Sequence, residues 1–414
     1  MEKNLDRKLA RMHAQPGSCR DFILADAKDA DMAFGLAAPG QSPEYYGQEG
    51  RFRSLAEYRR LIRDVVQQGL VDIVILSASN NYHLTIEERL FEKSPVTPAS
   101  RANDTSDIHL PRGNRYGQEP SRPFRTATID QMQCGKADCL PEERGRGANL
   151  GLYSVTFNNQ LERDLRTLDA YRDFRLEAER KGFRHFLEVF DPNVTDAVDP
   201  ALLGHFINDH IARLLAGVPQ PGRPVFLKIV YHGPRFMEEL AAYDPHLIPG
   251  ILGGASGTTY DAFKLLSEAR RHGARAALFG RKINNSEHQL TFIQFLRWIA
   301  DGQIEPEEAV PAYHAALGKL GLRPYRPLEK DRELSNPAVS YSGGGTRTQV
   351  ASGFTPEPAP REPRVEPPAP AEPVAAEYPL KADGEYDFSS FTQEQRLRFN
   401  QEQRDRVYGR YPSR

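Results

Sequence analysis

Short apolar runs alternate with longer amphipathic segments along the chain, and the alternation is most regular after Gly147. Five mostly apolar runs, which we expect to form buried strands, lie at residues 150–157, 184–190, 224–230, 248–252 and 274–279. Segments with apolar positions at helical spacing, which we expect to form helices, lie at residues 159–181, 200–216, 235–242, 258–272 and 287–301. Such alternation is typical of parallel strands joined by right-handed crossovers.

The first third of the chain shows the same pattern less clearly. Apolar runs at residues 21–26 and 71–76 predict two further strands, and a helix between them begins after Ser54 and ends at Gly69. Residues 82–92 predict a short helix. A third early strand has two rival candidates, residues 95–102 and residues 124–132.

Two early strands, one of uncertain position and five later ones make eight. The sequence therefore predicts an α/β fold, a (β/α)8 TIM barrel, with an irregular insertion at about residues 95–147 that elaborates one rim. The alternative is a doubly wound open sheet. That fold normally carries a phosphate loop after its first strand, and the sequence has none there.

The character of the chain changes after Leu334. We expect a barrel domain at residues 1–334, a disordered Pro/Ala/Glu-rich linker at residues 335–382, and a short helical segment at residues 383–414. The last segment is a candidate for docking on the barrel or on a protein partner, and a solvated tail is the alternative.

Composition narrows the classes of function. The net charge of -2, from 54 basic and 56 acidic residues, gives no reason to expect a nucleic acid or an anionic membrane as partner. Three cysteines fit a reducing compartment better than a disulfide framework. The N-terminus lacks the apolar core of a signal peptide, and no stretch is long enough to span a membrane. We therefore expect a soluble cytoplasmic protein.

Lys228 is the most informative residue, because it interrupts an otherwise apolar strand. Burial of an ammonium is costly and favours the neutral amine, which can attack a carbonyl and form a Schiff base. A lysine paired with a carboxylate, or one reaching water, is the alternative. Glu188 lies on the preceding strand and shares its inward face, so it could carry protons for Lys228 or hold it in an ion pair.

Asp26 ends the first strand, with Leu24 and Lys28 on its face, and we expect it to point at the same barrel mouth as a third catalytic group. A capping role is the alternative. His232, two residues beyond the apolar run, is either a substrate contact or an ordinary loop residue.

The last two strands predict an anion site. Gly253 and Gly254 follow one strand, and Gly280 and Arg281 follow the next. The corresponding loops of TIM barrels commonly bind a phosphate through backbone N–H groups, and Arg281 could add a bidentate contact.

Other polar residues predict less. Cys134 and Cys139 have no second pair and are expected to be ordinary thiols, and the histidines are dispersed, so neither a metal nor a cofactor is expected. Basic side chains in and beside the insertion predict a solvated rim that could close over an anionic substrate: Arg101, Arg112, Arg115, Arg122 and Arg125.

Four short stretches resemble the class I aldolases of the deoxyribose-phosphate, fructose-bisphosphate and tagatose-bisphosphate aldolase superfamily. They are Phe186-Leu187-Glu188-Val189, Phe226-Leu227-Lys228-Ile229, Gly253-Gly254-Ala255-Ser256 and Leu278-Phe279-Gly280-Arg281. The resemblance spans about residues 150–320 and is loose before them. An Asp-His-Gly motif of one branch is replaced here by Asp26-Ala27-Lys28.

The resemblance implies a Schiff-base lysine at Lys228, an acid/base carboxylate at Glu188, a substrate-positioning aspartate at Asp26, and a sugar-phosphate site at the glycines and Arg281. The resulting hypothesis is a lyase, a class I aldolase that cleaves or forms a C–C bond in a phosphorylated sugar, acting as a homo-oligomer. The alternatives are a phosphate-binding barrel isomerase and a catalytically silent scaffold.

Overall fold

The structure, a computed structural model, describes residues 1–40, 52–194, 196–254 and 257–335, with residues 379, 390–392 and 395. The chain divides into two compact units, of which the first comprises Met1–Gln41 and Phe52–Val350. Nearly all of the predicted linker and terminal segment, residues 336–414, lies outside the described residues.

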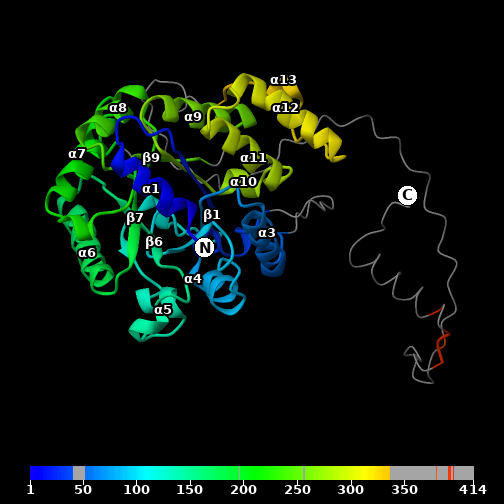
Figure 1. The fold of residues 1–414 in the computed structure, drawn as a ribbon, viewed down its shortest axis with the longest axis horizontal. Helices are drawn as coiled ribbons and strands as arrows, with labels where there is room; N and C mark the ends of the chain where they lie inside the picture. Colours follow the sequence, from blue (N-terminus) through cyan, green and yellow to red (C-terminus); the bar gives the residue numbers. More distant parts are fainter. Residues whose placement is uncertain are drawn as a thin grey trace. The chain divides into compact units, whose positions relative to one another are not determined.

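Eight parallel strands close into a barrel, so the predicted (β/α)8 TIM barrel is confirmed (Figure 1). The strands of the barrel, in their order around it, are β1 (Ile23–Lys28), β2 (Ile73–Leu76), β3 (Thr97–Arg101), β6 (Leu150–Thr156), β7 (Arg184–Phe190), β8 (Leu227–Ile229), β9 (Gly250–Leu252) and β10 (Ala276–Phe279). The third strand therefore comes from the first of its two predicted positions. A small antiparallel pair, β4 (Asp104–Thr105) and β5 (Pro123–Phe124), lies within the insertion.

Helices surround the barrel, and several of them lie where amphipathic segments predict them. The helices are α1 (Asn4–Ala14), α2 (Asp31–Phe34), α3 (Leu55–Gln68), α4 (Ala78–Asn81), α5 (Ile129–Cys134), α6 (Leu161–Arg180), α7 (Leu203–Ala216), α8 (Pro234–Tyr243), α9 (Thr259–Arg271), α10 (Arg281–Asn284), α11 (Gln289–Ala300), α12 (Pro306–Lys319) and α13 (Leu328–Asp331). A π-helical turn at Tyr82–Glu87 and 3-10 turns at Gly35–Ala37, Tyr116–Gln118, Pro141–Glu143 and Gln220–Gly222 complete the list.

Helix α3 shows how local sequence sets an element's ends. The Ser54 hydroxyl accepts a hydrogen bond from the Glu57 backbone, and the Glu57 side chain accepts one from the Ser54 backbone, which closes a capping box. Gly69 ends the helix with φ 69°, a left-handed conformation that glycine adopts without steric cost.

Each barrel strand has one face inside the barrel and one toward the helices. The interior core contains Ile23, Ala25, Phe186 and Phe226, whereas Leu24 belongs to the larger core between strands and helices. Side chains alternate between the two faces along a strand. The core to which one residue belongs therefore shows which way each of the remaining residues of that strand points.

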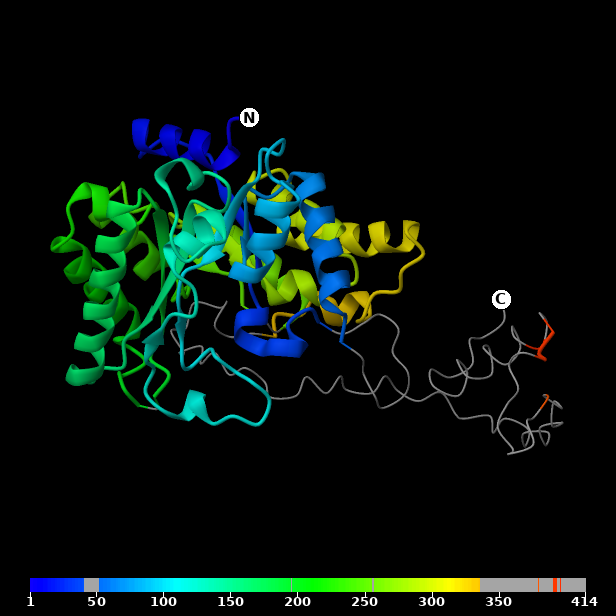
Figure 2. The same ribbon diagram turned by 90° about the horizontal axis from the view of Figure 1, so that it is seen from below.

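Helix α1, which the sequence pattern does not predict, closes the amino-terminal end of the barrel. Leu5, Leu9 and Met12 pack into the interior core, and the helix lies along one end of the barrel in Figure 2. Lys8 Nζ lies 2.7 Å from Asp72 and donates to the Phe22 carbonyl at 2.8 Å.

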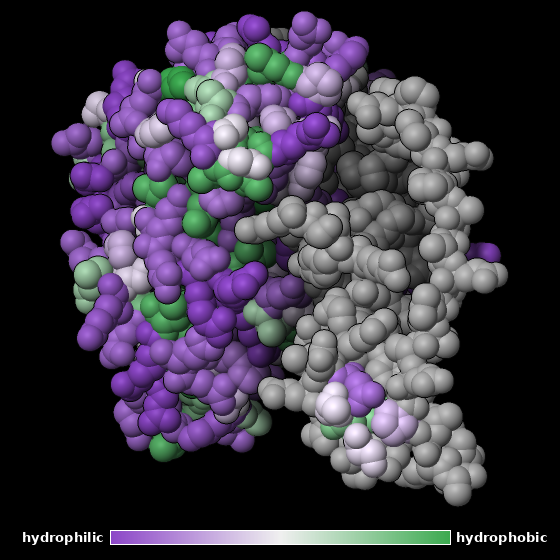
Figure 3. All heavy atoms as spheres, turned by 90° about the vertical axis from the view of Figure 1, so that its right-hand side faces the viewer, coloured by the Kyte–Doolittle hydropathy of each residue, from purple (hydrophilic) through white to green (hydrophobic). Residues whose placement is uncertain are grey.

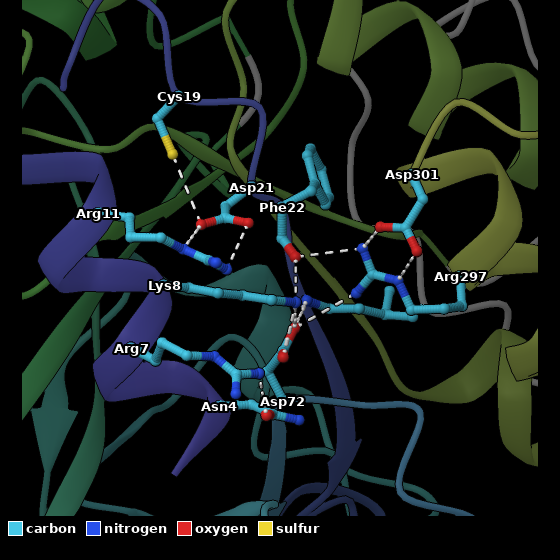
Figure 4. A network of polar contacts seen from close by, with 11 residues as sticks. Asn4, Arg7, Lys8, Arg11, Cys19, Asp21, Phe22, Asp72, Arg297 and Asp301 are labelled. Carbon is cyan, nitrogen blue, oxygen red and sulfur yellow. Dashed lines mark hydrogen bonds and ion pairs between the residues drawn. The ribbon is translucent and has the colours of Figure 1, made fainter. Parts of the chain in front are cut away.

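Arg297 of α11 approaches the same two groups, at 3.3 Å from Asp72 and 3.2 Å from the Phe22 carbonyl (Figure 4). Burial lowers the pKa of Lys8, and the charge of Asp72 opposes that shift. The cluster fastens α1 and α11 to the barrel through one buried carboxylate.

Cys134 and Cys139 are joined by a disulfide, so the expectation of two ordinary thiols is wrong. The pair lies at the end of α5, where five residues of separation let the chain turn back on itself. Cys19 is free.

The face of the described residues seen in Figure 3 is mostly hydrophilic, with hydrophobic side chains in small separate groups. Within the described part of the chain, no helix combines the length and the apolar character that a membrane span requires.

Candidate active site at the carboxyl ends of the barrel strands

Lys228 and Glu188 form an ion pair inside the barrel. They are register partners on β8 and β7, and Lys228 Nζ lies 2.5 Å from a Glu188 carboxylate oxygen. Their side chains are 8% and 1% exposed. The predicted inward direction and proximity of the two residues are therefore confirmed, and one carboxylate compensates the buried ammonium.

Two stacked aromatic rings lie on the amino-terminal side of this pair. Two residues earlier on the same strands, Phe186 and Phe226 stack with ring centroids 4.5 Å apart. Both rings belong to the interior core that α1 closes from the other end. The pair therefore lies between this apolar core and the carboxyl ends of the strands.

Ser154 of β6 extends the pair to a third strand. Its hydroxyl donates to the second carboxylate oxygen of Glu188 at 2.6 Å, and Ser154 is the register partner of Glu188. One Glu188 oxygen thus contacts the lysine and the other contacts a hydroxyl. This arrangement fixes the direction of the carboxylate.

Arg101 belongs to the same network, although the sequence predicts it on a solvated rim. It is the last residue of β3, faces the interior and is 6% exposed. Its guanidinium lies 2.5 Å from Asp29 and 3.7 Å from Asp104, and donates to Ser154 at 3.4 Å.

The electrostatics of this cluster favour a charged guanidinium. Burial alone would lower the pKa of Arg101, but the charges of Asp29, Asp104 and Glu188 outweigh it and raise that pKa. Burial raises the pKa of Asp104 to about 6, and the Arg101 charge opposes the shift.

Asp26 does not point at the mouth, and this part of the prediction is wrong. It is the register partner of Val74 and Phe279, which belong to the core between strands and helices, so it faces outward. Its carboxylate lies 3.2 Å from Lys28 Nζ, with neither side chain exposed. Lys28 also donates to Asn284 at the end of α10.

The three predicted glycines have clear backbone roles. A Cβ at Gly253 would lie 2.1 Å from the Phe279 ring, and one at Gly280 would lie 2.8 Å from the Ala27 carbonyl oxygen. Gly254 has φ +63°, which disfavours other residues. The Gly253 N–H donates to the Leu278 carbonyl at 2.8 Å, so it is committed within the sheet. Ala255 and Ser256 of the quoted motif lie outside the described residues.

Arg281 is the first residue of α10, directly after β10, and its predicted contact with phosphate stays a prediction. Its guanidinium carbon sits 5.6 Å from the centroid of the Phe34 ring. Burial lowers the pKa of Arg281, and the negative charge of Glu188 opposes that shift. Arg281 is therefore a partly buried cation whose charge interacts with the Glu188 carboxylate.

His232 pairs with Asp191, the residue that follows β7. Its Nε2 lies 2.8 Å from Asp191 Oδ1, and both side chains are 7% exposed. Whether substrate contacts His232 stays a prediction. In the described residues, no cluster of three or more His, Cys, Asp or Glu side chains could hold a metal ion.

Sequence reasoning does not single out Ser154 or Asp29, and it assigns Arg101 to a solvated rim. Alternate side chains of the predicted strand at residues 150–157 point inward, and Ser154 is the inward residue that lies beside Glu188. The sequence pattern could therefore have identified Ser154. The other two come from the ends of β1 and β3, and nothing local in the sequence predicts that they meet.

No family model matches the sequence, and no curated protein matches it. Solved structures share its fold. An archaeal fructose 1,6-bisphosphate aldolase superposes with a TM-score of 0.50 at 16% identity, over 72% of this chain and 100% of its own. A second structure of an archaeal enzyme, with the catalytic lysine covalently bound to the carbinolamine intermediate of the substrate, has the same values.

Fructose-bisphosphate aldolase from Slackia heliotrinireducens DSM 20476 superposes with a TM-score of 0.52 at 12% identity, over 75% of this chain and 91% of its own. Identities this low show a common fold. The resemblance to the class I aldolases is thereby confirmed as a resemblance of fold.

Proposed function

We propose that this chain, which has the barrel fold of the class I aldolases, is a lysine-dependent aldolase acting on a phosphorylated sugar. The carrying observation is the Lys228–Glu188 pair at 2.5 Å, on adjacent strands near the carboxyl end of a closed barrel. An amine beside a carboxylate can supply both the nucleophile and the proton carrier that Schiff-base chemistry needs.

The first half of the proposed cycle forms the Schiff base. Glu188 takes a proton from the Lys228 ammonium, and the freed amine adds to the ketone carbon of the substrate. The carbinolamine then loses its hydroxyl as water, with the proton that Glu188 holds, and becomes an iminium ion. The stacked rings of Phe186 and Phe226 exclude water from the amino-terminal side of the reacting atoms.

The second half breaks the C–C bond. The bonding electrons move into the iminium and leave an enamine, while the hydroxyl of the departing fragment gives its proton to the Glu188 carboxylate and becomes an aldehyde. That proton then goes to the enamine carbon. Hydrolysis of the renewed iminium releases the ketone and restores Lys228.

The ion pair also defines the rival hypotheses. If Lys228 stays charged and never attacks the carbonyl, the barrel is an isomerase that uses it electrostatically, or a scaffold without activity. Ser154 bears on this, since its hydroxyl holds one oxygen of Glu188 while the other oxygen contacts Lys228.

A cleavage assay tests the proposal. Full-length protein is incubated with a panel of ketose phosphates, and aldehyde release is followed by NMR for the wild type and for Lys228→Arg. We expect aldehyde from at least one ketose with the wild type only. Lys319→Arg, at the end of α12 and far from β8 along the chain, is the matched control and should cleave like the wild type. Cleavage by Lys228→Arg, or isomerisation in place of cleavage, would sink the proposal.

A further inference from the structure

The amino terminus of α9 already holds an anion that belongs to the protein. The Thr259 N–H donates to Asp331 of α13 at 2.8 Å, and the side chain of Asp331 is 3% exposed. This helix follows β9, where the sequence predicts part of a phosphate site. His314 Nε2 lies 2.9 Å from the other Asp331 oxygen.

Asp331 is held in its charged form. Burial raises its pKa, but the hydrogen bonds from Thr259 and His314 outweigh burial and hold that pKa below its ordinary value. A phosphate placed at the same helix end would meet a carboxylate at close range, and like charges repel strongly where solvent is scarce.

The side chain of Lys282 also lies near the amino terminus of α9. Its Nζ donates to the Gly257 carbonyl at 2.7 Å. Burial lowers the pKa of Lys282 to about 8, and the charges of Asp331 and Asp261 oppose the shift. Lys282, the residue after Arg281, therefore interacts with protein carboxylates.

Other cationic side chains at the mouth also have carboxylate partners. Lys228 pairs with Glu188, and Arg101 pairs with Asp29. For Arg281, by contrast, the part of the chain that the structure describes offers no ion pair, only the Phe34 ring and the field of Glu188. A partly buried guanidinium in this position can donate hydrogen bonds to acceptor groups such as those of a phosphate or a carboxylate.

We propose that the mouth takes a carbonyl compound with a single anionic group, phosphate or carboxylate, which Arg281 binds, and that Asp331 excludes a second anionic group from the end of α9. That the ligand has a carbonyl group rests on the proposed function. That it has a single anionic group rests on the surroundings of Arg281 and Asp331. It separates this chain from the bisphosphate substrates that the names of the similar structures give.

Calorimetry on the full chain tests the proposal with five probes: dihydroxyacetone, dihydroxyacetone phosphate, pyruvate, fructose 1-phosphate and fructose 1,6-bisphosphate. We expect dihydroxyacetone phosphate or pyruvate to bind about 10- to 100-fold more tightly than dihydroxyacetone, since a hydrogen-bonded charge pair contributes that much. Which of the two binds more tightly identifies the anion as phosphate or carboxylate. The 1-phosphate and the 1,6-bisphosphate should bind within about threefold of each other.

Variants separate the two residues. In Arg281→Gln, the anionic group of the ligand should no longer increase the affinity, and in Arg281→Lys part of this increase should remain. Arg166→Gln, exposed on α6, is the control and should bind like the wild type. Asp331→Asn should bind the bisphosphate more tightly than the wild type does, because it removes the competing charge.

Three results would overturn the inference: a bisphosphate bound tenfold more tightly than the monophosphate by the wild type, equal binding by Arg281→Gln, or no response to Asp331→Asn. Inorganic phosphate provides a readout that needs no Schiff base. If no ketose is cleaved but phosphate binding still depends on Arg281, the aldolase proposal fails and the single-anion site stands.

Discussion

At the residue scale, the position of a side chain along a barrel strand decides whether it reaches the lumen. Glu188 and Lys228 share the parity of Phe186 and Phe226, and all four lie inside. Asp26 has the parity of Leu24 and lies outside. The sequence cannot make this distinction on β1, because both faces of that strand are apolar and buried.

Glu188 is expected to be needed for turnover and not for anion binding. Glu188→Gln keeps the size of the side chain but cannot accept a proton, so kcat should fall about 100-fold or more, while the affinity for a phosphorylated ligand changes little. Steady-state kinetics with calorimetry measure both. Ser154→Ala, which only releases one carboxylate oxygen, should reduce kcat less. A Glu188→Gln protein with nearly normal kcat would rule out the proposed proton carrier.

Asp31 is expected to make stability depend on pH. Burial raises its pKa to about 6, although the Ser77 hydroxyl donates to it at 2.6 Å. A carboxyl whose pKa is raised in the folded state binds protons more tightly there, so its contribution to the free energy of unfolding is lost as pH rises from about 4 through 6.

Asp31→Asn removes that titration. At pH 7.5 the variant should be more stable than the wild type by roughly 1–2 kcal/mol, and at pH 4.5 the difference should nearly vanish. Denaturant unfolding at the two pH values measures this. Asp169→Asn, whose carboxylate is 64% exposed, serves as the control. An equal effect of Asp31→Asn at both pH values would contradict the assignment.

At the element scale, helices that alternate with strands could be predicted, whereas α1, α12 and α13 could not. Alternation gives the first group its positions, because each crossover needs a helix. Helix α1 precedes the first strand, and the other two follow the last. Their packing depends on partners distant in sequence, such as Asp72 for Lys8 and Thr259 for Asp331.

The carboxylate of Asp72 is expected to hold α1 on the barrel. Asp72→Ala leaves Lys8 and Arg297 without a shared partner in a buried place, which should cost about 3–5 kcal/mol of unfolding free energy. Asp21→Ala removes an ion pair with Arg11, which is more exposed than Lys8 and Arg297 (Figure 4). This substitution should cost less than about 1 kcal/mol of unfolding free energy. Denaturant unfolding compares them. Equal costs would show that α1 is held by its apolar side chains alone.

At the scale of the whole molecule, the barrel and the Lys228–Glu188 pair inside it were predictable, because both follow from strand parity and alternation. The network of Asp29, Arg101 and Ser154 was not, because ion pairs between distant segments leave no local pattern. The Cys134–Cys139 disulfide also contradicts a prediction, since the number of cysteines alone does not say which pair meets.

Residues 328–335 are expected to belong to the barrel domain. Asp331 caps α9, and Ser335 donates to Asp261 at 2.6 Å from its hydroxyl. A chain ending at residue 335 should keep the Tm of the full protein, whereas one ending at residue 327 should lose several degrees, because caps contribute about 1 kcal/mol each. Calorimetric unfolding of both chains decides this. An unchanged Tm for the shorter chain would show that the segment does not stabilise the barrel.

The mass of the peptide that contains Lys228, after incubation with a ketose phosphate and reduction with borohydride, tests the central claim most directly. We expect this peptide to gain the mass of the reduced substrate in the wild type, and the corresponding peptide of Lys228→Arg to gain nothing. An unmodified Lys228 peptide across dihydroxyacetone phosphate, ketose monophosphates and 2-oxo acids would contradict it, and the ion pair with Glu188 would then be structural.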